Sequence, residues 1–571
     1  MTLRTPLLAV PPRQGAWPVL WRTAAAVALS TVLPPALAQS APPTAGSLLQ
    51  SQQQRQTLPP EQSPGLSPLP APAEPDAAPT PGADTVTLVL REVQISGNQA
   101  IGTDALQQLA APYLGQRITW RDLQTLTQRM TQAYRSQGYL LARAWLAPQT
   151  VTGGQVQIRI LEGTLEQIRL HNQSAVPDAL IREVLAAQVP QGQALQGPAL
   201  ERALLLLNAL PGLAPVQATV QPGDAVGATV LEISAAAAPR LSGRVSADNQ
   251  GNHYTGTSRL GWDAALDNLT GHADRLALQG TLAGDGNTTG QLSWDALLSA
   301  SGARAGVLLA GSQYRLGQDY AALGAHGFSS TLGLYGSYPL VRTRDGFVDL
   351  TAQARQRQLQ DSMDAVGTVT RKRVPALELG AQGRQLADGA ATAWNGQLTL
   401  GHLSIGSDAA RAADAVAAHT DGSFAKLNAS VQRDQPLSGH WSARGLIGGQ
   451  LASRNLDASE QYSLGGPYGV RAYPVGEAAG DQGWQGRLEL RYALSAPWLV
   501  GLGYDAGGVQ VHRHAYGSGP DWLYRRGPAL FTQGQISQAD VALTLASRSS
   551  DPTLSAPDRH LRLWLSAGWR F

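Results

Sequence analysis

The polarity of the side chains alternates residue by residue over the last eleven positions of the chain. The apolar set is Leu561, Leu563, Leu565, Ala567, Trp569 and Phe571, and the other set is Arg562, Trp564, Ser566, Gly568 and Arg570. Because a β-strand has a side-chain period of two, one face of such a strand is apolar and the other is mostly polar. A strand of about ten residues with one apolar face is the unit of a transmembrane β-barrel. We therefore expect a barrel strand with Trp569 and Phe571 as its C-terminal signal, and an ordinary core strand is the alternative.

The same alternation, punctuated by glycine, recurs from about residue 241 to the end of the chain. Examples are residues 348–355, 426–432, 484–492 and 540–545. In the third example Trp484, Leu488 and Tyr492 alternate with Arg487 and Glu489. The 331 residues of this region provide about sixteen strands at about 20 residues per strand and connection. A soluble sandwich also alternates, but its polar face meets bulk water on an open sheet. We expect a transmembrane antiparallel β-barrel over residues 239–571.

The composition excludes several classes of protein. The chain has 571 residues, which is too many for one compact core, so two or more domains are expected. It contains no cysteine, which excludes disulfides and cysteine-based redox or zinc chemistry. Its net charge of +2 argues neither for nor against nucleic acid; with no basic run, we expect no nucleic-acid partner. The sequence has no nucleophile elbow, P-loop or HExxH motif, so we expect no enzyme activity, cofactor or metal.

The first 38 residues have the features of a secretory signal peptide. Arg4, Arg13 and Arg22 precede an apolar run over residues 23–33, and a small-x-small cleavage site ends at Ala38. No later stretch reaches the roughly 18 uninterrupted apolar residues that a membrane-spanning helix needs. We expect an exported protein without a helical membrane anchor.

Residues 39–85 are rich in Pro, Gln, Ser and Ala, which is typical of a linker. One island, residues 48–56 between Pro43 and Pro59, is compatible with a helix. Alone it is marginal, because it is shorter than about 12 residues.

Two successive modules with the order β-α-α-β-β follow the linker. In residues 86–163 the expected strands are 86–95, 140–146 and 155–161, and the expected helices are 103–114 and 119–137. Thr119 can cap the second helix, and Gly138 ends it. In residues 164–238 the expected strands are 164–170, 216–220 and 229–234, and the expected helices are 177–187 and 197–210. The repeated order of elements indicates two copies of one α+β unit.

Three short sequences within the barrel region carry a family resemblance. Residues 248–251, 255–256 and 268–271 look like a first barrel hairpin, residues 465–474 read GGPYGVRAYP, and residues 503–507 read GYDAG. In this order they resemble the outer-membrane transporters of two-partner secretion (TpsB, the ShlB/FhaC/HecB group), which belong to the barrel-assembly superfamily. The resemblance covers nearly the whole mature chain and implies a plug helix, two polypeptide-transport-associated (POTRA) modules and a sixteen-stranded barrel.

The match departs from the family pattern at two places. The loop signature VRG(Y/F) reads Val470-Arg471-Ala472-Tyr473 here, with alanine in the glycine position. Alanine disfavours a positive φ, so we expect a differently shaped loop tip. In the strand signature, Gly503 replaces the aromatic residue two positions before Asp505.

The resemblance implies a loop lock in the lumen, formed by Arg471 and Asp505. The loop motif residues are Gly465, Gly466, Val470 and Tyr473, and the strand motif residues are Tyr504 and Gly507. The strand phase agrees independently, because an outward apolar row that includes Leu502 and Tyr504 places Asp505 inside. The alternatives are an ordinary solvated charge for Arg471 and a generic lumen carboxylate for Asp505.

The resemblance also implies that the helix with Leu48, Leu49 and Gln52 lies through the pore as a plug; a structureless tether is the alternative. The small sheets of the POTRA modules have exposed edges that can accept an extended chain as an extra strand. Such binding suits a substrate that is still unfolded.

The sequence thus predicts a translocator in the outer membrane of a Gram-negative bacterium, with periplasmic N-terminal modules. It would secrete one large unfolded exoprotein, a haemolysin or adhesin, without ATP. Its other expected partners are outer-membrane lipid and the barrel assembly machinery. An insertase that assembles other barrels is the alternative, and a third reading is a passive porin, which the periplasmic modules argue against.

Overall fold

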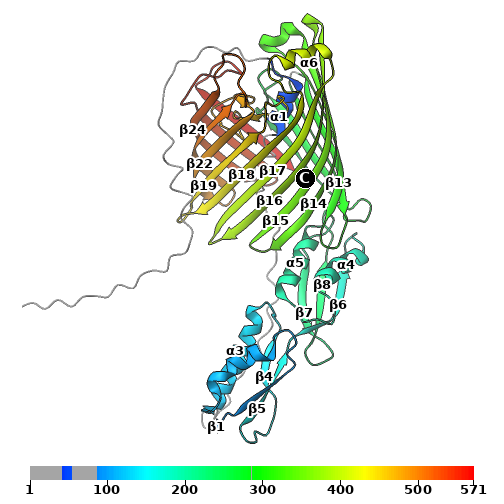
Figure 1. Ribbon diagram of the computed structural model, residues 1–571, viewed down its shortest axis with the longest axis vertical. Helices are drawn as coiled ribbons and strands as arrows, with labels where there is room; N and C mark the ends of the chain where they lie inside the picture. The colour runs from blue at the N-terminus through cyan, green and yellow to red at the C-terminus, as the bar shows by residue number, and fades with distance from the viewer. Residues whose placement is uncertain (1–41, 54–86, 285) are drawn as a thin grey trace, which may run out of the picture. The chain divides into compact units, whose positions relative to one another are not determined.

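A closed antiparallel barrel of sixteen strands forms the C-terminal part of the chain (Figure 1). The computed structural model describes residues 42–53, 87–284 and 286–571, so the expected signal peptide and most of the linker lie outside the described residues. The barrel strands are β9 (Leu241–Asp248), β10 (Arg259–Asp267), β11 (Arg275–Ala283), β12 (Asn287–Leu297), β13 (Arg304–Arg315), β14 (Ala325–Thr343), β15 (Gly346–Met363), β16 (Thr368–Ala387), β17 (Ala390–Ile405), β18 (Gly422–Pro436), β19 (Trp441–Ala452), β22 (Gln482–Ser495), β23 (Trp498–Gln510), β24 (Trp522–Ile536), β25 (Ala539–Ser547) and β26 (Leu561–Arg570). The predicted fold class and strand number are confirmed.

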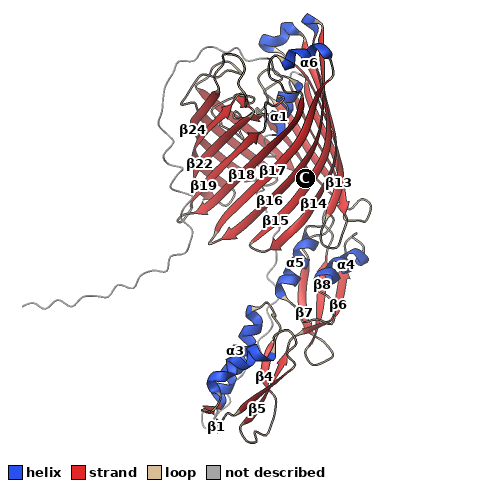
Figure 2. Ribbon diagram, in the orientation of Figure 1, coloured by secondary structure: helices blue, strands red, loops and turns tan. Residues whose placement is uncertain are grey.

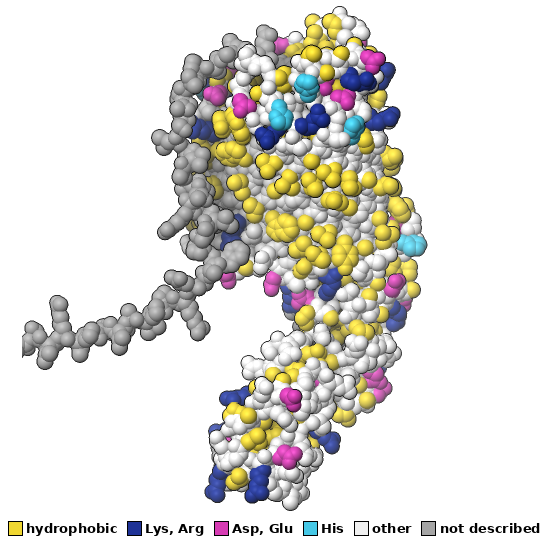
Figure 3. Space-filling model, viewed as in Figure 1, with side chains coloured by type: hydrophobic (Ala, Val, Ile, Leu, Met, Phe, Trp, Pro, Cys, Tyr) yellow, Lys and Arg dark blue, Asp and Glu magenta, His cyan; other side chains and the backbone are white. Residues whose placement is uncertain are grey.

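The alternating sequence gives the barrel an apolar outer wall. On β26, Leu561, Leu563 and Trp569 are exposed, whereas Trp564 is buried on the inner face. Figure 3 shows apolar side chains over the middle of the outer wall and charged side chains toward its ends. Closure pairs every strand with two neighbours, so no sheet edge is left facing the lipid.

The barrel closes between its last and first strands, β26 and β9. Their register runs from Ser566 opposite Asp248 to Arg570 opposite Arg244. Phe571 extends it, because its N–H donates to the Gly243 carbonyl at 3.0 Å and its carbonyl accepts from the Gly243 N–H at 3.1 Å. Phe571 therefore takes part in the closure. Its ring lies against Gly243, where a Cβ would lie 2.4 Å from Phe571 Cζ.

The first module contains a three-stranded sheet in the order β2-β5-β4, with helices on one face (Figure 2). Its elements are β1 (Thr87–Val89), β2 (Glu92–Ser96), α2 (Thr103–Ala110), the 3₁₀ helix η2 (Ala111–Tyr113), β3 (Arg117–Thr119), α3 (Trp120–Ser136), β4 (Arg143–Leu146) and β5 (Gln155–Leu161). Leu123, Leu126 and Met130 of α3 pack in one core with Val156 and Ile158 of β5.

Helix α3 begins at a capping box, as the sequence predicts. The Thr119 hydroxyl accepts from the Asp122 N–H at 3.3 Å, and the Asp122 carboxylate accepts from the Thr119 N–H at 2.7 Å. These hydrogen bonds also hold the pKa of Asp122 below its usual value. Gly138 follows the helix with a φ of +92°, which favours glycine.

The expected single strand over residues 86–95 is wrong. The segment forms two strands in different sheets, because β1 pairs with β3 and β2 pairs with β5. Between them the Leu90 N–H donates to the Gln116 carbonyl and the Arg91 N–H to the Gly154 carbonyl, which marks the change of partner. The short strand β3 was also missed.

The second module repeats the arrangement, with a sheet in the order β6-β8-β7. Its elements are β6 (Thr164–Asn172), α4 (Asp178–Gln188), α5 (Gly197–Asn208), β7 (Gln217–Pro222) and β8 (Ala228–Ala235). Leu204 and Leu207 of α5 pack with Leu231 and Ile233 of β8 in a separate core. Among the helices that the structure describes, none combines the length and the apolar sequence needed to cross a membrane.

The connections between barrel strands contain short elements that alternation did not predict. These are η3 (Gln318–Leu323), η4 (Asp364–Val366), α6 (Asp408–Ala415), β20 (Tyr462–Ser463) and β21 (Ala479–Gly480). Helix α6 starts at Ser407, whose hydroxyl accepts from the Ala410 N–H at 3.1 Å. Helix α1 (Ala45–Gln53) precedes both modules in the sequence.

Candidate functional site

The connection between β19 and β22, residues 453–481, folds into the barrel lumen; we call it the lumen loop. Within it, β20 pairs with β21, and the Val470 N–H donates to the Leu464 carbonyl at 2.6 Å. Leu464, Val470 and Tyr473 are fully buried. The loop therefore has a fixed internal structure, and its apolar side chains share one core with residues of the barrel wall.

Arg471 and Asp505 form a bidentate ion pair between the lumen loop and β23. Arg471 Nε donates to Asp505 Oδ2 at 2.8 Å, and Arg471 Nη2 donates to Asp505 Oδ1 at 2.8 Å. The Arg471 backbone N–H also donates to Asp505 Oδ2, at 3.0 Å. Arg471 is 4% exposed and Asp505 1%. Two parallel charge-assisted hydrogen bonds in a buried setting fix both the position and the orientation of the loop tip.

Two further charged residues of β22 bond directly to this pair. Arg471 Nη1 donates to Glu489 Oε1 at 2.8 Å, and Arg487 Nε donates to Asp505 Oδ1 at 3.0 Å. Arg487 also donates through Nη2 to the Gly469 carbonyl of the loop, at 2.6 Å. The sequence reasoning missed Arg487 and Glu489 as site residues, although both lie on the polar face of the alternating segment 484–492.

The small residues of the motifs allow close approach both within the loop and between the loop and the wall. A Cβ at Gly465 would lie 2.0 Å from the Pro474 carbonyl oxygen, and Gly466 has a φ of +105°. On β23, a Cβ at Gly507 would lie 2.7 Å from Leu464 Cδ2. Tyr504, in contrast, points out of the barrel and is 45% exposed.

Ala472, which stands where the family motif has glycine, is accommodated at the loop tip without strain. Its φ is not positive, so the alanine side chain causes no backbone strain. Ala472 is fully buried, and its Cβ lies against Gly527 of β24. A Cβ added at Gly527 would lie 2.8 Å from Ala472 Cβ.

The loop tip is also attached to the last strand and the last connection. Trp564 Nε1 on β26 donates to the Arg471 carbonyl at 2.7 Å. The Tyr473 hydroxyl lies 2.9 Å from Ser550 Oγ. Glu477, fully buried, accepts from Arg525 Nη2 of β24 and from the Ser555 hydroxyl, both at 2.7 Å. Glu477 could not be recognised as a site residue from the sequence, because only the folded loop brings it to its partners.

Helix α1 lies in the lumen against strands β13 to β15. Its Ala45 N–H donates to Asp361 Oδ1 at 2.7 Å, and Tyr314 donates to the same oxygen at 2.6 Å. Leu48 is buried in an apolar cluster with Tyr314 and Leu359, and Leu49 packs against this cluster. Gln52 lies in the last turn of the helix.

A cavity of about 970 Å³ remains beside the helix. Leu48 and Leu49 line it together with polar wall residues that include Arg355, Glu378 and Gln397. Over the part of the chain that the structure describes, no group of three His, Asp or Glu side chains is placed to hold a metal ion.

Two family matches agree with these features. Residues 227–523 match the family described as "Haemolysin secretion/activation protein ShlB/FhaC/HecB". Residues 88–163, which contain the first module, match "POTRA domain, ShlB-type".

Several curated proteins are similar over most of the chain. The heme/hemopexin transporter protein HuxB of Haemophilus influenzae (strain 86-028NP) is 29% identical over 501 residues, which cover 86% of this chain and 88% of HuxB. The outer membrane transporter CdiB of Escherichia coli is 26% identical over 467 residues, covering 79% of this chain and 76% of CdiB.

Solved structures share the fold. CdiB from Escherichia coli superposes with a TM-score of 0.73 at 21% identity and covers 94% of this chain and 100% of that chain. CdiB from Acinetobacter baumannii gives a TM-score of 0.64 at 17% identity, covering 91% of this chain and 96% of that chain.

The family match spans more than half of the sequence and includes the lumen loop with Arg471 and the strand with Asp505. The chain therefore belongs to the ShlB/FhaC/HecB family of haemolysin secretion/activation proteins, and it is a two-partner secretion transporter of the Gram-negative outer membrane rather than an enzyme.

Proposed function

We propose that this transporter secretes one large exoprotein, of the haemolysin or adhesin class, as an unfolded chain through its barrel and without ATP. The observation that carries the proposal is that two separate segments occupy the lumen, both held by side-chain contacts. The lumen loop is anchored by Arg471 on Asp505, and α1 by Ala45 on Asp361. Segments held in this way can move aside without opening the closed barrel ladder.

We assign a role to each segment in the order of the chain. Residues 1–38 direct export, and residues 39–85 provide the plug helix and its tether. Residues 86–163 and 164–238 are POTRA modules that receive the exoprotein, and residues 239–571 form the pore. The outward apolar side chains contact outer-membrane lipid, and we infer that the barrel assembly machinery inserts the barrel.

We infer that the exoprotein binds to sheet edges of the POTRA modules. Each module has a three-stranded sheet with two edge strands, β2 and β4 in the first and β6 and β7 in the second. An extended chain can pair with such an edge through backbone hydrogen bonds, which tolerate many sequences, while neighbouring side chains add selectivity. Edge pairing suits a cargo that is unfolded in the periplasm.

Two relatives are each named for what they transport, which supports a dedicated cargo here. HuxB is called a heme/hemopexin transporter protein, and the related ShlB of Serratia marcescens is called a hemolysin transporter protein. By analogy, the cargo of this chain is one large exported protein.

Deleting the gene tests secretion against barrel assembly, the alternative function for a POTRA–barrel protein. We expect one large exoprotein to disappear from the medium while the other barrel proteins of the outer membrane keep their abundance. Quantitative proteomics of the medium and of the outer membrane measures both, and a plasmid copy of the gene is the control. Loss of many barrel proteins with no single missing exoprotein would contradict secretion and support an insertase.

A further inference from the structure

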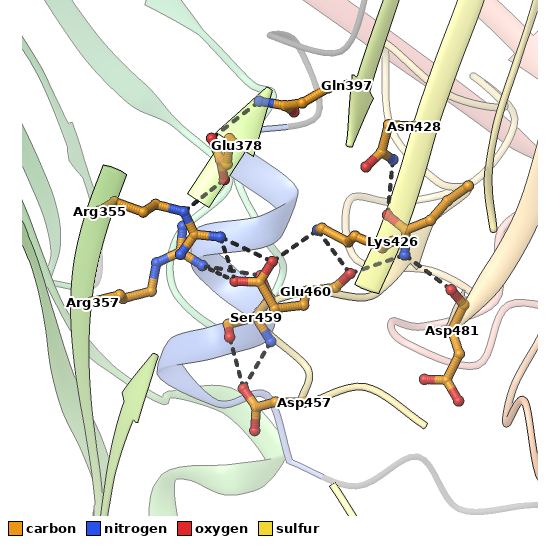
Figure 4. Close-up of polar contacts among 11 residues, drawn as sticks. Arg355, Arg357, Glu378, Gln397, Lys426, Asn428, Asp457, Ser459, Glu460 and Asp481 are labelled. Carbon is orange, nitrogen blue, oxygen red and sulfur yellow. Dashed lines mark hydrogen bonds and ion pairs between the residues drawn. The ribbon is translucent and has the colours of Figure 1, made fainter. Parts of the chain in front are cut away.

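A second charged cluster lies on a different wall of the lumen from the Arg471–Asp505 pair. Its centre is Glu460 of the lumen loop, which is 1% exposed and receives three cations (Figure 4). Arg355 Nη2 donates to Glu460 Oε1 at 2.8 Å, and Arg357 Nη1 donates to the same oxygen at 2.7 Å. Lys426 Nζ lies 2.9 Å from Glu460 Oε2.

The strands that carry these cations are β15, with Arg355 and Arg357, and β18, with Lys426. Glu378 of β16 accepts from Arg355 Nε at 2.7 Å and is the other carboxylate of the group. The Arg471–Asp505 pair, in contrast, is attached to β22 and β23. The lumen loop is thus fixed to two separate parts of the barrel wall.

The charge balance of the cluster depends on Glu460. Three cations share this one loop carboxylate, and Arg355 and Arg357 are themselves buried. Removing one partner from a buried ion pair is strongly destabilising, because the remaining charges are left uncompensated. Neutralising Glu460 therefore weakens the attraction between this end of the loop and the wall.

The turn next to Glu460 contacts helix α1. The Asp457 carboxylate accepts from the Ser459 N–H at 3.1 Å and from the Ser459 hydroxyl at 2.8 Å, and Lys372 Nζ lies 2.5 Å from the other Asp457 oxygen. A Cβ at Gly46 of α1 would lie 2.7 Å from the Ser459 backbone nitrogen and 3.2 Å from Asp457 Oδ1. The glycine lets α1 lie directly on this turn, as Figure 4 shows.

One arginine links the cluster to the turn. Arg357 Nη1 donates to Glu460 Oε1 and also to the Ser459 carbonyl, at 3.3 Å. Lys426 Nζ donates to the Glu460 carbonyl at 3.1 Å. The cations therefore hold the backbone on which α1 rests as well as the carboxylate.

We propose that Glu460 is a positioning residue: together with Arg355, Arg357 and Lys426 it holds the Asp457–Ser459 turn as the seat of the plug helix. The Arg471–Asp505 pair fixes the loop tip, and the Glu460 cluster fixes the part of the loop that retains α1. This inference rests on the proposed plug role of α1. Beyond that role, we infer that the lumen loop controls the release of α1.

A thiol placed on α1 reports whether the helix is seated. The chain contains no cysteine, so Ala45→Cys introduces a single thiol at a position that is buried when α1 is in the lumen. Its labelling by a membrane-impermeant maleimide is measured in the full-length protein in outer-membrane vesicles. We expect Glu460→Gln to raise the labelling rate by at least about tenfold over the Ala45→Cys parent. Glu460→Asp, which keeps the charge, should label at a rate close to that of the Ala45→Cys parent.

Asp349→Asn is the matched control. Asp349 lies on β15, the strand of Arg355 and Arg357, and its carboxylate lies 2.5 Å from Arg342 Nη2. It is neutralised in the same way but has no contact with the turn, so labelling should stay at the parental rate. Equal acceleration by Asp349→Asn would overturn the proposal, because any lost charge in the wall would then release the helix.

Heat-modifiable gel mobility shows whether each barrel is folded. If Glu460→Gln does not fold, Lys426→Gln tests the same contact from the wall, and we expect faster labelling in the same direction. Parental labelling in a folded Glu460→Gln or Lys426→Gln barrel overturns the inference. The plug role itself fails separately, if removing α1 leaves the conductance of the pore unchanged.

Discussion

Replacing Arg471 or Asp505 by alanine is expected to lower the amount of exoprotein in the medium by at least about tenfold. Either change leaves a buried charge without its bidentate partner, which costs about 3–5 kcal/mol. After Asp505→Ala, Arg471 and Arg487 both lose a carboxylate. After Arg471→Ala, the loop tip loses the two side-chain hydrogen bonds to Asp505 and keeps only the one from its backbone N–H. Immunoblotting of the medium and of whole cells measures the effect.

The double replacement is expected to be scarcely worse than either single one, because residues that act as a unit are strongly non-additive. Arg471→Lys should restore secretion only in part, since lysine keeps the charge but lacks the planar two-pronged donor. Independent, additive defects in the double mutant would show that the two residues do not act as a pair.

Asp349→Ala is the control for a charge lost from the barrel wall away from the loop, and it should secrete normally. Surface abundance and heat-modifiable mobility should stay near the wild type in all of these variants. The barrel is held by its closed hydrogen-bond ladder rather than by one ion pair.

Removing residues 40–60 is expected to raise the single-channel conductance in planar bilayers while the barrel stays folded. The deletion removes α1, which lies against β13 to β15 and lines the lumen cavity with Leu48 and Leu49. Without the helix, the water-filled cross-section at this level of the pore increases.

A matched variant replaces residues 61–81 by a Gly/Ser sequence of the same length. It keeps α1 and a flexible tether of the same number of residues, so its conductance should match the wild type. Unchanged conductance after removal of residues 40–60 would mean that this segment is only a tether.

The barrel could be predicted from the sequence because the two faces of each strand are set by residues that are neighbours in the chain. Alternation of side chains sets the two faces of each strand, and chain length sets the approximate strand number. The phase of β23 likewise placed Asp505 inside the barrel and Leu502 and Tyr504 outside, as in the structure. Such a pattern tells which face a residue occupies, but it does not tell which residues meet across the lumen.

The contacts of the lumen loop could not be predicted for this reason. Glu460 and Glu477 lie in irregular segments, and their cationic partners come from strands far away in the sequence. Arg487 and Glu489 lie on a recognisable polar face, yet only the folded loop brings Arg471 between them. The family motifs pointed to Arg471 and Asp505 because each residue lies in a short recognisable sequence, although the two residues are far apart in the chain.

The errors in secondary structure have different causes. Residues 86–95 carry one continuous strand pattern, and the change of pairing partner at Leu90 depends on the positions of Gln116 and Gly154. Helix α6 had a local signal that was overlooked, since Ser407 precedes an alanine-rich run and caps it.

Reconstitution of the purified protein tests whether the barrel secretes an unfolded exoprotein without ATP. The exoprotein lost from the medium of the deletion strain is denatured in urea and diluted onto proteoliposomes that contain the transporter with its modules facing outward. We expect full-length exoprotein to become protected from added protease without any nucleotide, and the Arg471→Ala transporter to give at least about tenfold less protection. Protection that requires ATP, or that is equal in liposomes without the transporter, would contradict secretion through this barrel.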